Sequence, residues 1–330
     1  MEFVARRIDR ISSQISRNLD LAGPTSYMIR ILGTIFAGLM GLAFGSFLNV
    51  CLSRWPADQS IVSPRSHCRQ CGRTLTWWEN LPLVSWLALR GRCRTCRTWI
   101  GWRYPLVELV LGVLWASTAW RFPTSVFGPD LPRVALYDSL MTTLGLMLFY
   151  WLLAALAVLD AENLWLPNWL TLPGTCVGLL LSVFSFVVAV KLDSITQSRP
   201  YTFNYLTGEQ WQVAGSRLLG IIAAAGLVLL IRCVYWLIRR REGIGLGDAK
   251  LMALLAAWLG LPGALLAFGL GVVLGALIAI VLLAMSTKDK DKRGWAHKKL
   301  PLGTFLCIGG MVSSLWGQPI IAAYLRWSGF

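Results

Sequence analysis

Charge is scarce in this sequence, and so is histidine. Only 14% of the 330 residues are Asp, Glu, Lys or Arg, whereas soluble domains carry about 25%. The two histidines, His67 and His297, both lie in polar loops. The sequence therefore lacks the residues that a Ser-His protease or an HExxH metalloprotease would need. No cleavable signal peptide is expected either, because "MEFVARRIDRISSQISR" has alternating charges and no apolar core.

Apolar residues make up 56% of the chain, which also contains 17 Trp and 31 Gly. They form runs that approach or reach the roughly 17 to 25 residues a helix needs to cross a bilayer. We therefore predict an all-α polytopic membrane protein with about eight transmembrane helices, at 28–50, 105–120, 137–159, 169–190, 217–238, 250–262, 263–284 and 302–324. Only a GLPG turn separates 250–262 from 263–284, which leaves open that one of them is a tilted or incomplete span.

Basic residues predict the orientation of the chain. Nine Arg lie in 52–103, and the segments "RRREGIGLGDAK" and "KDKDKRGWAHKK" are also basic. Lys and Arg concentrate in cytoplasmic loops, so all three are predicted on that side. The same count places the basic segment 1–27 outside, a conflict that an amphipathic surface helix or a miscounted span would resolve.

The net charge of +15 bears on the partners of the chain. A nucleic-acid binder would show a separate basic domain with interleaved aromatics, and the sequence has none. The basic loops between apolar runs instead predict contact with anionic membrane lipid.

Four of the eight cysteines form two CxxC pairs, Cys68 with Cys71 and Cys93 with Cys96. Four thiolates at this spacing are typical of tetrahedral zinc, and they leave no open coordination position for catalysis. The alternatives are two local disulfides, which a reducing cytoplasm disfavours, and unrelated free thiols. We therefore predict a small cytoplasmic zinc-ribbon-like loop domain with one structural Zn²⁺.

Carboxylates at the ends of apolar runs are the candidate catalysts, because a charge near the bilayer core is expensive. Asp160 closes the run "YWLLAALAVLD", and Asp248 follows Gly245 and Gly247 in "GIGLGDAKL". On the predicted topology both lie at cytoplasmic helix ends, where two carboxylates sharing a site would act as acid and base toward water. The alternatives are solvated helix ends, a non-catalytic zinc scaffold, and a proton-coupled transporter using both aspartates as a relay, although the inverted repeats typical of transporters are not found.

Five motifs occur in order along 40–325: "GSFLNVCLSRWP", the paired CxxC with "LTWWENLPLVSWLALRGRCRTC", "RYPLVELVLG", "LDAENLWLPNWLTLP" and "GLGDAKL". Together they resemble the bacterial type IV prepilin peptidase family, membrane aspartic proteases that also N-methylate their product. The resemblance implies that Asp160 and Asp248 are the catalytic pair of an inner-membrane enzyme. It also implies cleavage of prepilins or type II secretion pseudopilins after a Gly on the cytoplasmic side, with methylation of the new N-terminus from S-adenosylmethionine.

The resemblance suggests a division of the chain into a basic segment 1–27, a first transmembrane helix 28–51, a zinc-binding loop domain 52–103 with the methyltransferase part, and a peptidase domain 104–330.

Lys250 completes the motif of Gly245 and Gly247, and either tunes Asp248 or binds lipid phosphate. Asn168 departs from the family, in which many relatives carry Asp. No nucleotide fingerprint marks 52–103, so the methyltransferase residues are candidates only: Glu79, Asn80, Arg103, Tyr104 and Glu108. An Arg103–Glu108 ion pair at a span end is the alternative role for two of them.

Overall fold

The computed structural model describes residues 24–123, 133–196, 203–241, 245–286 and 300–329. Most of the predicted segment 1–27 therefore lies outside the described residues. The secondary structure of the described residues is helical. Apart from the helices, these residues form two isolated β-bridges, His67–Thr74 and Arg92–Trp99. The long helices are α2 (Pro24–Arg54), α4 (Arg103–Trp120), α5 (Arg133–Asn163), α6 (Asn168–Thr196), α7 (Phe203–Arg239), α8 (Leu246–Ser286) and α10 (Leu302–Trp327).

Six of these helices are long and apolar enough to cross a membrane, which confirms the prediction of an all-α polytopic membrane protein. They are α2, α5, α6, α7, α8 and α10. Large apolar side chains such as Leu32 and Phe36 are more than half exposed on them, as expected of surfaces that face lipid. The predicted span 105–120 is present as α4, which is helical but not among the six.

The predicted spans 250–262 and 263–284 are the two arms of α8, which kinks between them. At the kink Gly260 has φ +72°, a left-handed conformation that L side chains rarely adopt. Pro262 follows two residues later and cannot donate a backbone hydrogen bond. The turn predicted at GLPG is therefore the place where α8 kinks.

The chain divides into two compact units. Unit 1 contains residues up to 47 and 66–147, and unit 2 contains 48–65 and 148–330. The boundaries of these two units reflect how compactly the chain packs, and they carry no information on function. The functional division of 52–103 from 104–330 therefore stays a prediction.

In unit 1, glycines let α2 and α4 approach closely. A Cβ added at Gly41 would lie 2.6 Å from the carbonyl oxygen of Leu111, and one at Gly45 would lie 2.7 Å from Cα of Glu108. Such contacts are how helices associate in lipid, where apolar burial gives no net drive between them. Between α2 and α4 the chain forms the cysteine module, residues 66–102, with the short helices η2 (Trp77–Asn80) and α3 (Val84–Ala88).

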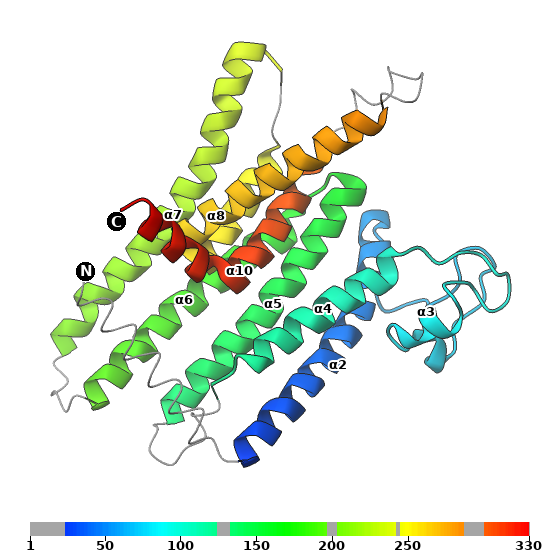
Figure 1. Ribbon diagram of the computed structural model, residues 1–330, viewed down its shortest axis with the longest axis horizontal. Coiled ribbons are helices and arrows are strands. Elements are labelled where there is room, and N and C mark those ends of the chain that lie inside the picture. Colours follow the sequence, from blue (N-terminus) through cyan, green and yellow to red (C-terminus); the bar gives the residue numbers. More distant parts are fainter. Residues whose placement is uncertain (1–23, 124–132, 197–202, 242–244, 287–299, 330) are drawn as a thin grey trace. The chain divides into compact units, whose positions relative to one another are not determined.

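In unit 2, α8 packs on α6 and α10, and these helices run side by side in Figure 1. Trp258 of α8 donates from Nε1 to the carbonyl oxygen of Gly174 of α6 at 2.9 Å. Ser313 of α10 donates to the carbonyl oxygen of Gly263 of α8 at 2.8 Å. These contacts hold α8, whose first turn carries Asp248, against α6 and α10.

Candidate active site and metal centre

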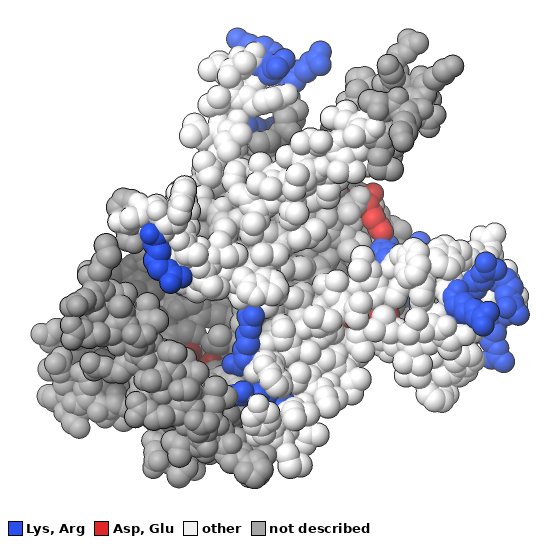
Figure 2. All heavy atoms as spheres, viewed as in Figure 1, with Lys and Arg blue, Asp and Glu red and all other residues white. Residues whose placement is uncertain are grey.

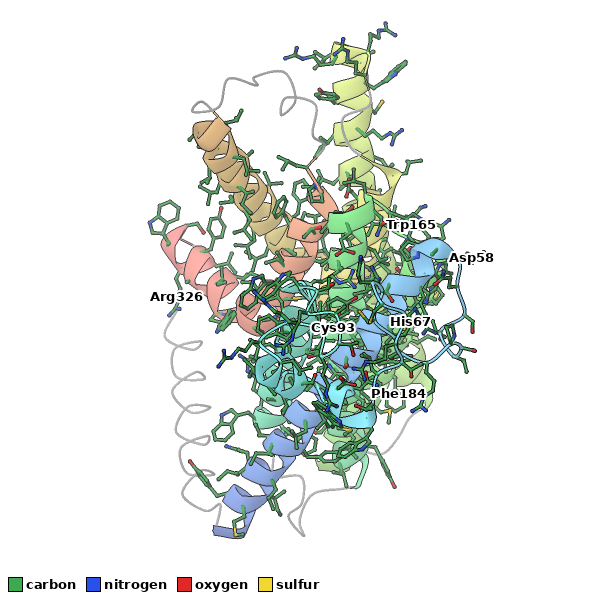
Figure 3. The ribbon with its side chains drawn as sticks, turned by 90° about the vertical axis from the view of Figure 1, so that its right-hand side faces the viewer. Asp58, His67, Cys93, Trp165, Phe184 and Arg326 are labelled. Atoms are coloured by element: carbon green, nitrogen blue, oxygen red, sulfur yellow. The ribbon has the colours of Figure 1, made fainter. Side chains whose placement is uncertain are left out.

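Asp160 lies in the last turn of α5. The helix ends because Leu164 takes a left-handed conformation, φ 51°, from which its N–H donates to the carbonyl oxygen of Asp160 at 2.9 Å. Pro167 follows, and α6 begins directly after it. The turn between α5 and α6, marked by Trp165 in Figure 3, therefore holds Asp160 at a fixed helix end, where it is only 6% exposed.

The first turn of α10 supplies the hydrogen bonds of Asp160. The backbone N–H of Thr304 donates to Oδ2 of Asp160 at 2.7 Å, and the Thr304 hydroxyl lies 3.3 Å from the same oxygen. That hydroxyl also lies 2.9 Å from the carbonyl oxygen of Ala157. The first N–H groups of a helix have no partner inside the helix, so they are free to bind a carboxylate.

Asp248 lies in the first turn of α8 and is 8% exposed. Its Oδ2 accepts the backbone N–H of Gly245 at 3.2 Å. A side chain that reaches back to the N–H preceding its own helix forms half of a capping box. Asp248 therefore sits at the N-terminus of its own helix, whereas Asp160 sits at the N-terminus of another.

Leu166 connects the two helix starts. A Cβ added at Gly247 of α8 would lie 3.0 Å from Cδ1 of Leu166, and one added at Gly303 of α10 would lie 3.1 Å from the same atom. The starts of α8 and α10 thus pack on one leucine of the turn that follows Asp160. The turn that follows Asp160 therefore packs on the first turn of α8, which carries Asp248.

The motif lysine does not contact the aspartates directly through a described hydrogen bond. Its Nζ donates to Oδ1 of Asn168 at 2.6 Å, so Lys250 ties the first turn of α8 to the first residue of α6. Asn168 is therefore the partner of Lys250. The bond joins two elements that border the candidate site.

Sequence reasoning missed Gly303, Thr304 and Leu166. A Cβ at Gly303 would lie 2.8 Å from Oδ2 of Asp160, so only glycine fits there without displacement. The available signal was "PLGT" at the start of a span, where Pro301 precedes the helix. None of these residues has a charged side chain, and Thr304 acts partly through its backbone.

The four predicted cysteine ligands lie together in the cysteine module. Their Sγ atoms are all within 4.8 Å of one another, and those of Cys68 and Cys96 are 3.7 Å apart. Tetrahedral Zn–S bonds of about 2.3 Å place sulfurs about 3.8 Å apart. The set fits one metal ion with four thiolate ligands, and His67 is not part of this cluster.

Each CxxC pair lies on a tight backbone loop, called a knuckle below. In the first knuckle the N–H of Gly72 donates to the carbonyl oxygen of Cys68, and in the second the N–H of Arg97 donates to that of Cys93. Gly72 and Arg97 both have positive φ, 69° and 57°. The hydroxyl and backbone of Thr98 stabilise the thiolate of Cys96 and lower its pKa to about 6. This favours the form that binds metal.

Two of the methyltransferase candidates hold the cysteine module together. Glu79 is buried and pairs with Arg73, and its other oxygen accepts the backbone N–H and hydroxyl of Thr76 at 2.9 and 2.7 Å. Burial opposes ionisation of Glu79, but these hydrogen bonds and Arg73 lower its pKa to about 2. Oε2 of Glu108, in α4, accepts the N–H of Leu83 at 2.8 Å.

The other three candidates are not gathered by described contacts into one ligand site. Asn80 is exposed at the end of η2. The guanidinium of Arg103 lies over the ring of Tyr104, 4.8 Å from its centroid, at the start of α4. Within its own unit the structure gathers the four cysteines into one cluster, but it does not gather the five methyltransferase candidates into one site.

Comparison with known proteins finds two family models along the chain. The Bacterial Peptidase A24 N-terminal domain matches residues 39–122, and the Type IV leader peptidase family matches residues 147–280. No solved structure matches the chain.

Curated relatives match over most of their length and share the name prepilin leader peptidase/N-methyltransferase. The protein of Pseudomonas putida is 33% identical over 89% of this chain and 94% of its own. That of Stutzerimonas stutzeri is 31% identical over 88% and 93%, and that of Burkholderia pseudomallei strain 1026b is 33% identical over 86% and 85%.

Proposed function

The chain belongs to the Type IV leader peptidase family, and we propose that Asp160 and Asp248 cleave prepilin leaders while the cysteine module serves N-methylation. It is an enzyme with protease and methyltransferase activity, as its relatives are. The observation that carries the peptidase assignment is the pair of buried carboxylates held at the N-termini of α8 and α10. In such a pair one carboxylate activates water while the other, protonated, donates to the scissile carbonyl.

The substrates we infer are type IV prepilins or type II secretion pseudopilins. Cleavage falls after the Gly that precedes their hydrophobic helix, and the new N-terminus receives a methyl group from S-adenosylmethionine. We place the protein in the bacterial inner membrane with the cysteine module and both aspartates on the cytoplasmic side, because the basic loops favour that orientation.

We propose that the cysteine module binds one structural Zn²⁺. The sulfur spacing and the purely thiolate donor set support this choice. The ion would fold a segment too small for its own core, on the order of 10 kcal/mol of binding energy. Because four Cys close the coordination sphere, the chemistry stays with other residues.

For the methyl donor we assign no completed site. Glu79 and Glu108 both accept hydrogen bonds from backbone N–H groups of the cysteine module, so we propose that they hold this part of the chain in shape. Asn80, Arg103 and Tyr104 remain the predicted contacts of S-adenosylmethionine or of the pilin N-terminus.

The surface of the cysteine module supports contact with anionic lipid. Trp99 and Trp102 are 49% and 65% exposed, and Val84 and Leu87 of α3 are 60% and 67% exposed on one helix face. Arg side chains gather over the same module in Figure 2. Exposed Trp with surrounding Arg is typical of surfaces at the membrane interface.

The test uses the purified full-length protein, a prepilin and S-adenosylmethionine, with product masses read for cleavage and for the added methyl. Asp160→Asn and Asp248→Asn should each abolish cleavage and leave the protein folded. Glu162→Gln, an exposed acid in the same last turn of α5, is the matched control and should cleave normally. Cleavage by either aspartate variant would refute the pair.

The transporter hypothesis has no support from the relatives named above, which carry a peptidase and methyltransferase name. Proton flux in liposomes without any peptidase activity would be required to revive it.

A further inference from the structure

We propose that Thr304 is a positioning residue that decides which carboxylate begins the peptidase reaction as the base. With Thr304 in place, Asp160 starts as the anion and Asp248 starts with the proton. This inference rests on the proposed peptidase function, and it adds which of the two aspartates starts the reaction as the base and which as the acid.

The starting point is the unfavourable place of Asp160 on its own helix. Asp160 lies in the last turn of α5, where the carbonyl ends of the helix disfavour a negative charge. The first turn of α10 offsets this, because its N–H groups point outward from a positive helix end. The Thr304 N–H reaches Oδ2 of Asp160 at 2.7 Å, a length typical of hydrogen bonds to an ionised group.

The hydroxyl of Thr304 adds a second, switchable donor. It lies 2.9 Å from the carbonyl oxygen of Ala157 and 3.3 Å from Oδ2 of Asp160. A hydroxyl has one hydrogen, so it donates to one of these acceptors at a time. When Asp160 is charged the carboxylate is the stronger acceptor, and when Asp160 is protonated the hydroxyl returns to Ala157. The N–H and the hydroxyl of Thr304 both bind Oδ2 of Asp160. The other oxygen, Oδ1, is therefore left to take the proton of water.

Asp248 has the weaker set of donors. It also benefits from a helix N-terminus, that of α8, but its described hydrogen bond is a single N–H from Gly245 at 3.2 Å. Since the two charges repel, the pair shares one proton. The proton remains on the carboxylate with fewer and longer hydrogen bonds, which is Asp248.

The other titratable groups around Asp160 are few among the described residues. Asp248 lies in the first turn of α8, which packs on the same leucine as the start of α10, and the buried thiol of Cys307 lies one turn beyond Thr304 on α10. Glu162 on α5 is exposed, and Lys250 of α8 donates to Asn168 of α6. These groups are the same in every Thr304 variant, so they do not confound the comparison.

The reaction balances with this assignment. Asp160 takes a proton from water as the new C–O bond forms at the scissile carbonyl carbon, and Asp248 gives its proton to the carbonyl oxygen. In the collapse, Asp160 gives its proton to the leaving nitrogen as the C–N bond breaks. Asp248 takes a proton back from one hydroxyl of the intermediate as the carbonyl re-forms, which restores the starting state.

The experiment measures leader cleavage from pH 4.5 to 9 by full-length protein in lipid nanodiscs, for three variants. Thr304→Ser keeps both donors, Thr304→Val removes the hydroxyl, and Thr304→Pro removes the hydroxyl and the N–H. Proline is tolerated in a first helical turn, where the N–H has no helical partner. Thr143→Val is the matched control, because the hydroxyl of Thr143 bonds within α5 to the carbonyl oxygen of Ser139 at 2.7 Å.

We expect the acidic limb of the rate profile to move to higher pH by about one unit in Thr304→Val and further in Thr304→Pro. On that limb cleavage falls about tenfold for each unit, while the plateau above it changes little. Thr304→Ser and Thr143→Val should keep the wild-type profile.

A uniform loss at every pH, or an unchanged profile in both Thr304→Val and Thr304→Pro, would overturn the inference. These outcomes are distinct from failure of the proposed function. That failure would appear as no cleavage by wild type, or as cleavage that survives Asp160→Asn.

Discussion

Replacing Gly303 with alanine should remove most leader cleavage and leave the protein folded. A Cβ at Gly303 would lie 2.8 Å from Oδ2 and 2.9 Å from Cγ of Asp160. Carbon atoms normally approach to about 3.5–4.0 Å, so the carboxylate or the first turn of α10 must shift by roughly 1 Å. A displacement of about that size at a reacting group lowers the rate on the order of a hundredfold.

The assay is the initial rate of prepilin cleavage in lipid nanodiscs, with methylation of an already cleaved pilin measured separately. Cleavage by Gly303→Ala should fall about a hundredfold in kcat, whereas methylation should stay near the wild-type rate. The control is Gly269→Ala in α8, where an added Cβ meets nothing within 4 Å. Thermal unfolding of both variants shows whether the chain is intact.

Cleavage by a folded Gly303→Ala protein within about threefold of wild type would refute the reasoning. It would mean that α10 does not approach Asp160 this closely in the working enzyme. Equal losses of cleavage and methylation would likewise point to general damage instead of a displaced carboxylate.

Three further predictions concern the module and the motif lysine. Glu108→Ala leaves the N–H of Leu83 without its acceptor, which should destabilise the module by about 1–3 kcal/mol; hydrogen exchange of residues 77–90 should rise, and methylation should fall more than cleavage. Cys96→Ser, or extraction of the metal by a chelator, should release one zinc per chain by elemental analysis and abolish methylation, whereas a variant that retains both zinc and activity would contradict a four-cysteine site. Lys250→Met removes the 2.6 Å bond to Asn168 and should weaken cleavage about tenfold or less, with Lys250→Arg restoring part of it; no change in either would show that this bond does not support the site.

The sequence by itself determined the class of the protein and the chemistry of its groups. Long apolar runs must form helices in lipid, because each backbone group needs a partner within its own segment. Four cysteines in two CxxC pairs predict a metal site from local spacing alone, and the described sulfurs do lie together. Asp160 and Asp248 became candidates because each lies at the end of an apolar run, within one of the motifs that carry the resemblance.

Tertiary structure decided how those groups are held. The donor to Asp160 lies 144 residues away in Thr304, and it is partly a backbone N–H, which every residue except proline carries. The hydrogen bond from Leu83 to Glu108 likewise spans 25 residues and gives a candidate ligand a structural contact. Residue type fixes which atoms can bind a metal or move a proton, but only packing fixes which helix end meets which carboxylate, because that contact depends on distance in space and leaves no periodic pattern in the chain.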